Sequence, residues 1–355
     1  MTLNSYEKLR EFLDQFPIGF RKTKSGVEIK ILKRLFTEEE AELTTFLTIR
    51  PERARTIARR TGKRLAEIEE KLELMAKKGL IFRTHRENQT LYNAAPFMIG
   101  LYEYSVKKID KELAQLFKEY YHTAGLEEIG ASNIPGFKVI PLEETIQSDT
   151  TLYPYQMLKE SIKHARKIAV TDCVCRKESQ LLGEGCNHPL ETCLSFGVAA
   201  EYYIENGLGR EITSEEAIQI IKETDEAGLV HAGANSKHLS NICNCCPCCC
   251  VSMKGMTQYG LNKEKFMNAI FESIIDRDLC IACGSCVERC PVNAISLNEV
   301  AEVDRNLCLG CGLCSNVCPE EAIHLKPRKD LEEPFDRVLD MGIAILEGKR
   351  KTSRD

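Results

Sequence analysis

Two stretches of the chain repeat one another: residues 280–291 read CIACGSCVERCP, and residues 308–319 read CLGCGLCSNVCP. Each is a C-x2-C-x2-C-x3-C-P run, and the second follows the first at an offset of 28 residues. Gly284 and Gly312 come directly after the second Cys of their runs, where the missing Cβ lets the backbone come close to whatever the thiols bind. The repeat therefore predicts two equivalent loops, each carrying four thiols.

This repeat resembles the bacterial-type two-cluster ferredoxin domain, in which the fourth Cys of each run binds the cluster of the other run. The resemblance implies two [4Fe-4S] clusters, each transferring one electron. It implies two ligand sets, the first being Cys280, Cys283, Cys286 and Cys318 and the second Cys308, Cys311, Cys314 and Cys290. The alternative is zinc, but zinc sites use pairs of thiols with longer spacers rather than triples followed by Cys-Pro.

The chain of 355 residues holds 18 Cys, none before Cys173 and none after Cys318. Thiols that only fill a core would be spread along the chain, so core packing does not explain this grouping. A cytoplasmic chain keeps its thiols reduced and does not rely on disulfides. Metal binding is then the usual role for so many thiols.

Ten of these cysteines lie in the middle of the chain, and six of the ten fall within residues 243–250. The ten are Cys173, Cys175, Cys186, Cys193, Cys243, Cys245, Cys246, Cys248, Cys249 and Cys250. The six contain three overlapping C-x2-C pairs, at 243/246, 245/248 and 246/249. One ion or one cubane takes about four thiolates, so these six cannot all serve one site.

We interpret the middle segment as the site of one or two additional iron–sulfur clusters, with the assignment of individual cysteines left open. The segment resembles Cys-rich iron–sulfur proteins of anaerobes that carry a ferredoxin tail. Zinc binding and a redox-active thiol site remain alternatives. His188, His231 and His238 are further ligand candidates. Arg176, next to Cys175, is a candidate partner for cluster charge or for an anionic substrate.

Residues 36–95 read as three helices followed by a hairpin. Thr37 and Glu40 predict a capping box at the start of the first helix, and the next two helices are expected over 51–60 and 65–78. This order resembles a winged-helix domain, which implies nucleic acid as a candidate partner. The third helix, which would enter the DNA groove, is rich in Glu, and its charge opposes phosphate binding.

The sequence therefore predicts an α+β multidomain chain. We expect a winged-helix-like domain with an N-terminal extension, a linking helix, a mainly helical Cys-rich domain, a two-cluster ferredoxin domain and a helical tail, over residues 1–98, 99–125, 126–270, 271–327 and 328–355. The hydrophobic pattern adds helices and two short strands. The helices are expected over 154–167, 192–206, 213–227 and 333–349, and the strands over 168–170 and 229–231.

Charge and hydropathy limit the class of protein. The 48 Lys and Arg against 53 Asp and Glu give a net charge of −5, which argues against a histone-like wrap of nucleic acid. Residues 1–100 hold 20 basic and 14 acidic side chains, whereas residues 276–325 hold 3 and 8. No apolar run approaches the ~20 residues of a membrane helix. Residues 1–13 lack the apolar core of a secretory signal, so we expect a cytoplasmic location.

The sequence contains no Gly-rich dinucleotide motif, Walker A run, G-x-S-x-G elbow or C-x-x-C-H haem site. Electrons must then be exchanged with a redox partner protein or with a substrate at the middle segment. We interpret the chain first as an iron–sulfur electron-transfer protein. The alternative is an iron–sulfur oxidoreductase with a substrate site at the middle cysteines, and a redox-sensing DNA-binding regulator is a third hypothesis.

Overall fold

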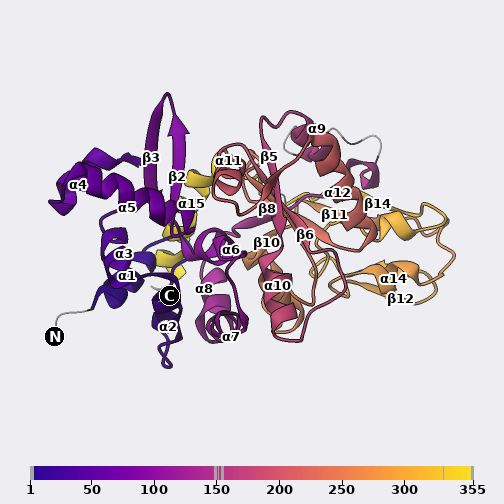
Figure 1. Ribbon diagram of the computed structural model, residues 1–355. Coiled ribbons are helices and arrows are strands. Elements are labelled where there is room, and N and C mark those ends of the chain that lie inside the picture. The colour runs from indigo at the N-terminus through magenta and orange to yellow at the C-terminus, as the bar shows by residue number, and fades with distance from the viewer. Residues whose placement is uncertain (1–3, 148–149, 151, 153–155, 331, 353–355) are drawn as a thin grey trace.

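The computed structural model describes residues 4–352 except 148–149, 151, 153–155 and 331. In Figure 1 the N-terminal helices lie at one end, the C-terminal Cys repeat lies at the other, and a sheet lies between them. The last helix, α15 (Val338–Thr352), returns to the N-terminal end. There Lys349 forms an ion pair with the buried Glu128. The tail helix was predicted from residue 333, and α15 begins five residues later.

The N-terminal part consists of helices and a three-stranded sheet of order β1-β3-β2. Its elements are α1 (Ser5–Leu13), α2 (Val27–Leu35), α3 (Glu38–Thr44), β1 (Glu52–Arg53), α4 (Ala54–Thr61), α5 (Leu65–Lys77), β2 (Ile81–Arg86) and β3 (Gln89–Ala94). The capping box of Thr37 and Glu40 is confirmed at the start of α3. The helix predicted from 51 starts only at Ala54, because the two residues before it pair with β3 instead. The winged-helix resemblance stays a prediction.

The single linking helix predicted over 99–125 is wrong. The chain forms α6 (Tyr102–Tyr104), then turns, and resumes as α7 (Lys111–Tyr120). The side chain of Asp110 accepts a hydrogen bond from the backbone N–H of Leu113 at 2.9 Å and so starts a new helix. A wide helical turn and α8 (Leu126–Ile129) complete the segment.

A sheet of seven strands forms the middle of the molecule, in the order β10-β4-β8-β9-β6-β5-β7. All neighbouring strands are antiparallel except β10 and β4. The strands are β4 (Phe137–Val139), β5 (Ile168–Asp172), β6 (Glu191–Phe196), β7 (Arg210–Glu211), β8 (Val230–Ala234), β9 (Asn241–Cys245) and β10 (Met267–Asn268). The prediction of a mainly helical middle domain missed this sheet, because its strands are short and pair across long stretches of chain.

The strands predicted for the middle segment agree with the structure, whereas two of its three predicted helices differ from it. The strands expected at 168–170 and 229–231 correspond to β5 and β8, and the helix expected over 213–227 is α12 (Ser214–Glu226). The helix expected over 192–206 is wrong in its first third, which belongs to β6, and is confirmed in the rest as α11 (Val198–Glu205). The helix expected over 154–167 is reduced to α9 (Leu158–Lys163), and residues 154–155 lie outside the described residues.

The two faces of the sheet carry different kinds of side chain. Helices α9 and α12 pack on one face around an aliphatic core, formed by Ile168, Val170, Leu194, Phe196 and Ile242 among others. Side chains of successive strand residues point to opposite faces. The residues between these aliphatic positions, Ala169, Cys193 and Cys243 among them, therefore point to the other face.

The C-terminal repeat is built from two small antiparallel ladders. Strand β11 (Phe271–Ile275) pairs with β14 (Ile323–Pro327), and β12 (Ile295–Leu297) pairs with β13 (Ala301–Val303). The short helix α14 (Ser285–Arg289) contains the third Cys of the first run and ends just before the fourth. None of the helices in the described part of the chain is long and apolar enough to cross a membrane.

Candidate metal centres

The structure brings the cysteines of the C-terminal repeat together in two sets. Cys280, Cys283, Cys286 and Cys318 line one small cavity, so the fourth Cys of the second run joins three from the first. In the other set Cys311 has Cys308, Cys314 and Cys290 as its electrostatic neighbours. Burial raises the pKa of Cys311, and the nearby thiols raise it further. These are the two sets that the ferredoxin resemblance implies.

The two Cys loops differ in exposure. In the first loop Cys283 is exposed, and Ile281 keeps 60% of its surface accessible. In the second loop Leu309 and Leu313 are buried in the main hydrophobic core of the molecule. The first set therefore faces outward and the second faces the body of the protein.

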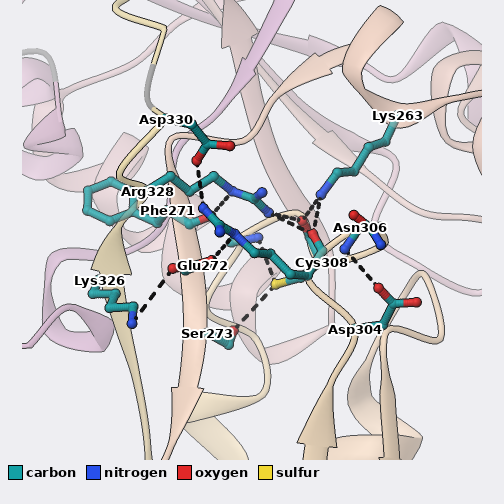
Figure 2. A network of polar contacts seen from close by, with 12 residues as sticks. Lys263, Phe271, Glu272, Ser273, Asp304, Asn306, Cys308, Lys326, Arg328 and Asp330 are labelled. Carbon is teal, nitrogen blue, oxygen red and sulfur yellow. Dashed lines mark hydrogen bonds and ion pairs between the residues drawn. The ribbon is translucent and has the colours of Figure 1, made fainter.

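A polar network holds the second loop against the body (Figure 2). The backbone carbonyl of Cys308 accepts hydrogen bonds from Lys263 Nζ and from Arg328 Nη2, both at 2.7 Å. Burial lowers the pKa of Lys263 to about 8. The hydroxyl of Ser273 lies 3.4 Å from Cys314 Sγ and 3.8 Å from Cys308 Sγ. Two cationic side chains and a hydroxyl thus fix the position of the first and third thiols of this loop.

Six of the ten middle cysteines form a closed ring, in which each thiol interacts with two others. We call this set the six-thiol ring; its order is Cys173, Cys175, Cys250, Cys245, Cys243, Cys193 and back to Cys173. The sulfurs of Cys245 and Cys250 lie 3.3 Å apart. All six line one cavity of about 290 Å³.

The sheet and two helices explain how the ring forms. Cys193 lies on β6, and Cys243 and Cys245 lie two residues apart on the neighbouring β9, so the alternation of strand side chains points them to the same face. The other three thiols lie at helix starts. Cys173 and Cys250 are the N-cap residues of α10 (Val174–Leu181) and α13 (Val251–Thr257), and Cys175 follows in the first turn of α10.

The thiols of the ring do not behave as independent groups. The pKa of Cys250 is lowered to about 5 by hydrogen bonds from Cys175 and Cys245. Hydrogen bonds with Cys173 and Cys250 raise the pKa of Cys175 well above 9, those with Cys243 and Cys250 do the same for Cys245, and burial adds to both shifts. Six neighbouring thiolates cannot lie side by side without a cation, and a coordinated metal removes the thiol protons. The ring therefore suits a polynuclear metal centre within the cavity.

The remaining four middle cysteines form a second, tighter set, which we call the four-thiol group. Its members are Cys186, Cys246, Cys248 and Cys249, and their sulfurs all lie within 4.8 Å of one another. Hydrogen bonding from Cys249 lowers the pKa of Cys246 to about 5, whereas burial raises the pKa of Cys248 to about 12. Of the three predicted C-x2-C pairs, only 246/249 stays together in the structure, because β9 turns Cys243 and Cys245 toward the cavity.

Arg176 lies between the two sets of thiols and is fully buried. Its guanidinium donates to the backbone carbonyl of Asn244 at 3.1 Å and to the hydroxyl of Thr192. Burial lowers the pKa of Arg176, but the neighbouring thiols, those of Cys173 and Cys193 first, raise it by more. Among the described residues no carboxylate pairs with this guanidinium, so the sulfurs are its nearest source of negative charge.

Comparison with known proteins identifies one part of the chain. Residues 273–325 match the family model of the 4Fe-4S dicluster domain. This match supports a C-terminal ferredoxin-like domain and iron–sulfur cluster binding. No curated protein and no solved structure matches the chain.

Glu103 lines the same cavity as the six-thiol ring but was not among the site residues predicted from the sequence. Its carboxylate accepts a hydrogen bond from the backbone N–H of Gly100 at 2.8 Å. Burial raises the pKa of Glu103 from 4.5 to about 8. Glu103 lies 70 residues before Cys173 in a segment predicted to be a plain helix, so no sequence signal linked it to the thiols.

The candidate histidines do not join the described thiol sets. His231 Nδ1 lies 2.6 Å from the Oδ1 of Asn244, and its Nε2 lies 3.6 Å from Asp225. His188 lines a surface cleft beside Cys248. The structure gives His231 a role in supporting β9 rather than a place among the sulfurs.

The N-terminal helix expected to meet DNA uses its lysines within the protein. Lys71 of α5 pairs with Glu39 and, at 3.0 Å, with Glu67. At the end of the helix Lys78 pairs with Glu40 at 2.6 Å. These side chains are therefore engaged by carboxylates, and DNA binding through residues 36–95 stays an untested prediction.

Proposed function

We propose that the chain is an iron–sulfur electron-transfer protein in which the exposed ferredoxin loop meets a redox partner and the six-thiol ring is the inner centre. The observation that carries this proposal is the asymmetry of the ferredoxin domain. One Cys loop is exposed and the other is buried against the body, and Cys290 of the second ligand set lines a cleft with Cys248 of the middle segment. A domain used only as a soluble carrier would have no need for this arrangement.

The residues present fit the groups that the proposal requires. The two ferredoxin sets would each hold one [4Fe-4S] cluster, and the six-thiol ring would hold one further iron–sulfur cluster in its cavity. When bound, such clusters supply one-electron redox chemistry. The protein supplies the thiolates, excludes water from the cavity with an apolar lining, and places the Arg176 charge beside the ring.

The outer face of the ferredoxin domain has the character of a transient docking surface. Leu279, Ile281 and Leu297 are exposed around the first Cys loop. The domain that carries them is acidic, since residues 276–325 hold 8 Asp and Glu against 3 Lys and Arg. An apolar centre with an acidic rim favours a partner protein with a basic rim, because complementary charge steers the encounter.

The test is anaerobic stopped-flow reduction of the full chain by a reduced electron-carrier protein, with freeze-quenched samples read by EPR. We expect the ferredoxin centres to be reduced first and the middle centre afterwards. The variant Cys283→Ser removes an exposed ligand of the outer set. In this variant we expect slower reduction of the ferredoxin centres and of the middle centre. The control is Leu307→Ser, an exposed change in the same domain. Reduction of the middle centre at an unchanged rate in Cys283→Ser would contradict the proposal.

An iron–sulfur oxidoreductase is the second candidate, favoured by Glu103. A carboxyl group with a pKa of about 8 is largely protonated near neutral pH and can donate a proton to a substrate that is being reduced beside it. The cavity would then admit a small, largely apolar molecule next to the ring. Anaerobic screening for reoxidation of the reduced protein by small acceptors tests this candidate. A substrate should be turned over by the wild type and at least tenfold more slowly by Glu103→Gln.

A further inference from the structure

The four-thiol group has the dimensions of a site for one metal ion. Cys249 Sγ lies 3.6 Å from Cys186 Sγ and 3.8 Å from Cys248 Sγ, and Cys186 Sγ lies 3.9 Å from Cys246 Sγ. The other pairs are within 4.8 Å. Every sulfur thus lies close to the other three, which is the arrangement of the corners of a tetrahedron.

These distances can be compared with the chemistry of thiolate ligands. Four sulfurs at about 2.3 Å from one tetrahedral ion lie about 3.8 Å from each other. In an iron–sulfur cubane each Cys binds a different iron, so the four ligand sulfurs are spread around the outside of the cluster and lie further apart. The measured separations of the four-thiol group agree with the first geometry.

The other cysteines of the chain provide an internal comparison. Among the described residues, the four-thiol group is the one set of three or more candidate ligands whose atoms all lie within 4.8 Å of one another. Neither ferredoxin set meets this condition, although its four thiols surround one site. The six-thiol ring does not meet it either, because its sulfurs encircle a cavity. The thiols of the two ferredoxin sets and of the six-thiol ring are therefore spread widely enough for clusters, whereas the four-thiol group is compact.

We infer that Cys186, Cys246, Cys248 and Cys249 bind a single tetrahedral metal ion, Zn²⁺ or mononuclear iron, and not an iron–sulfur cluster. Cys246 and Cys249 supply the C-x2-C pair that such sites use, and Cys186 and Cys248 complete it. This assignment replaces a second cluster in the middle segment. It does not depend on the direction of electron transfer or on the partner.

The surroundings indicate what the ion does for the fold. Cys186 lies on the irregular loop between α10 and β6, and the other three thiols lie on the turn after β9. With Leu229 and Ala227 they form a small hydrophobic cluster of their own. Cys248 also lines a cleft together with Arg289 and Cys290 of the ferredoxin domain. An ion held there would tie the loop to the turn beside the joint between the two domains.

The first experiment compares metal and sulfide contents of the full chain purified without oxygen. In Cys248→Ser we expect the loss of about one Zn²⁺ or one iron per chain, with acid-labile sulfide unchanged. Cys283→Ser is the matched control, because loss of a ferredoxin cluster removes about four iron and four sulfide together. Joint loss of iron and sulfide in Cys248→Ser, or no change in metal content, would overturn the inference.

A second measurement uses the wild type and does not depend on the folding of a variant. If zinc is present, X-ray absorption at the zinc edge should show four sulfurs at about 2.3 Å and no near iron neighbour. If the ion is iron, Mössbauer spectroscopy should show one tetrathiolate site in addition to the clusters. Absence of both signals would contradict a mononuclear site.

Discussion

The guanidinium of Arg176 is fully buried, and a buried charge is costly unless an opposite charge compensates for it. Its Nε has no hydrogen-bond partner within the described chain, and no described carboxylate pairs with it. The thiols of Cys173, Cys193 and Cys246 are its nearest acidic neighbours. Neutral thiols would leave the charge uncompensated, whereas metal-bound thiolates would balance it. The buried charge of Arg176 therefore favours anionic metal centres in both the six-thiol ring and the four-thiol group.

We expect Arg176→Gln to lower the reduction potential of the middle centre. Removal of a nearby positive charge disfavours the reduced, more negative form, and each ~1.4 kcal/mol of lost interaction corresponds to about 59 mV for a one-electron couple. Potentiometric titration followed by EPR measures the shift. The control is Arg210→Gln, which removes an exposed charge paired with Glu191 and Glu216. Equal potentials in Arg176→Gln and the wild type would show that the charge does not face the centre.

Glu103 should make the stability of the protein depend on pH. Burial raises its pKa in the folded chain from 4.5 to about 8, so the folded state holds a proton that the unfolded state releases. This contribution is complete below pH 4.5 and is lost as the pH rises through about 8. We expect the Tm to fall between pH 5 and pH 8, and to fall less in Glu103→Gln. The exposed Glu69→Gln is the control, and equal slopes in all three proteins would argue against a buried, protonated Glu103.

The strands decide how the ten middle cysteines are divided. Cys243 and Cys245 point to one face of β9, next to Cys193 of β6, and the chain then turns so that Cys246, Cys248 and Cys249 lie elsewhere. Spacing alone suggested overlapping pairs and left the assignment open, because it does not contain the long-range pairing of β6 with β9. The ferredoxin sets could be predicted, since their motif is local and repeats. The start of α3 was also predictable, because Thr37 and Glu40 form a capping box within one turn.

Gly310 should be essential for docking the second Cys loop. Its φ is +63°, and an added Cβ would lie 2.0 Å from the backbone oxygen of Phe271, so the loop would have to move away from β11. We expect Gly310→Ala to lose about four iron and four sulfide per chain. Gly62→Ala is the control, because Gly62 has a φ of +70° and nothing within 4 Å of its Cβ position. That variant should cost only about 1–2 kcal/mol of backbone strain and keep its metal. Full metal content in Gly310→Ala would contradict the tight docking.

The parts of the molecule are joined by specific contacts rather than by linkers. Arg289 of the ferredoxin domain donates to the last-turn carbonyls of Asp225 and Glu226 in α12, at 2.6 and 2.8 Å. Asn316, between the third and fourth Cys of the second run, donates to the Asp225 carboxylate at 2.5 Å. At the other end Arg83 pairs with Glu205 of α11 at 2.8 Å. The ferredoxin domain is thus held in a fixed orientation against α12.

This arrangement could be anticipated only in part from the sequence. The order of the parts and the chemistry of the repeat follow from local motifs. The mutual placement depends on contacts between residues such as Asn316 and Asp225, which are 91 positions apart and carry no recognisable pattern. The N-terminal part shows the same limitation, because its docking on α11 through Tyr202, which donates to the carbonyl of Ile81 at 2.8 Å, is invisible in the sequence.

We propose that the chain holds two ferredoxin clusters and a further iron–sulfur cluster in the six-thiol ring. The most direct test is the content of iron and acid-labile sulfide per chain in protein purified without oxygen, compared with Cys243→Ser. We expect at least about twelve of each in the wild type and about eight of each in the variant. About eight iron and eight sulfide in the wild type, unchanged by Cys243→Ser, would show that the ring holds no cluster.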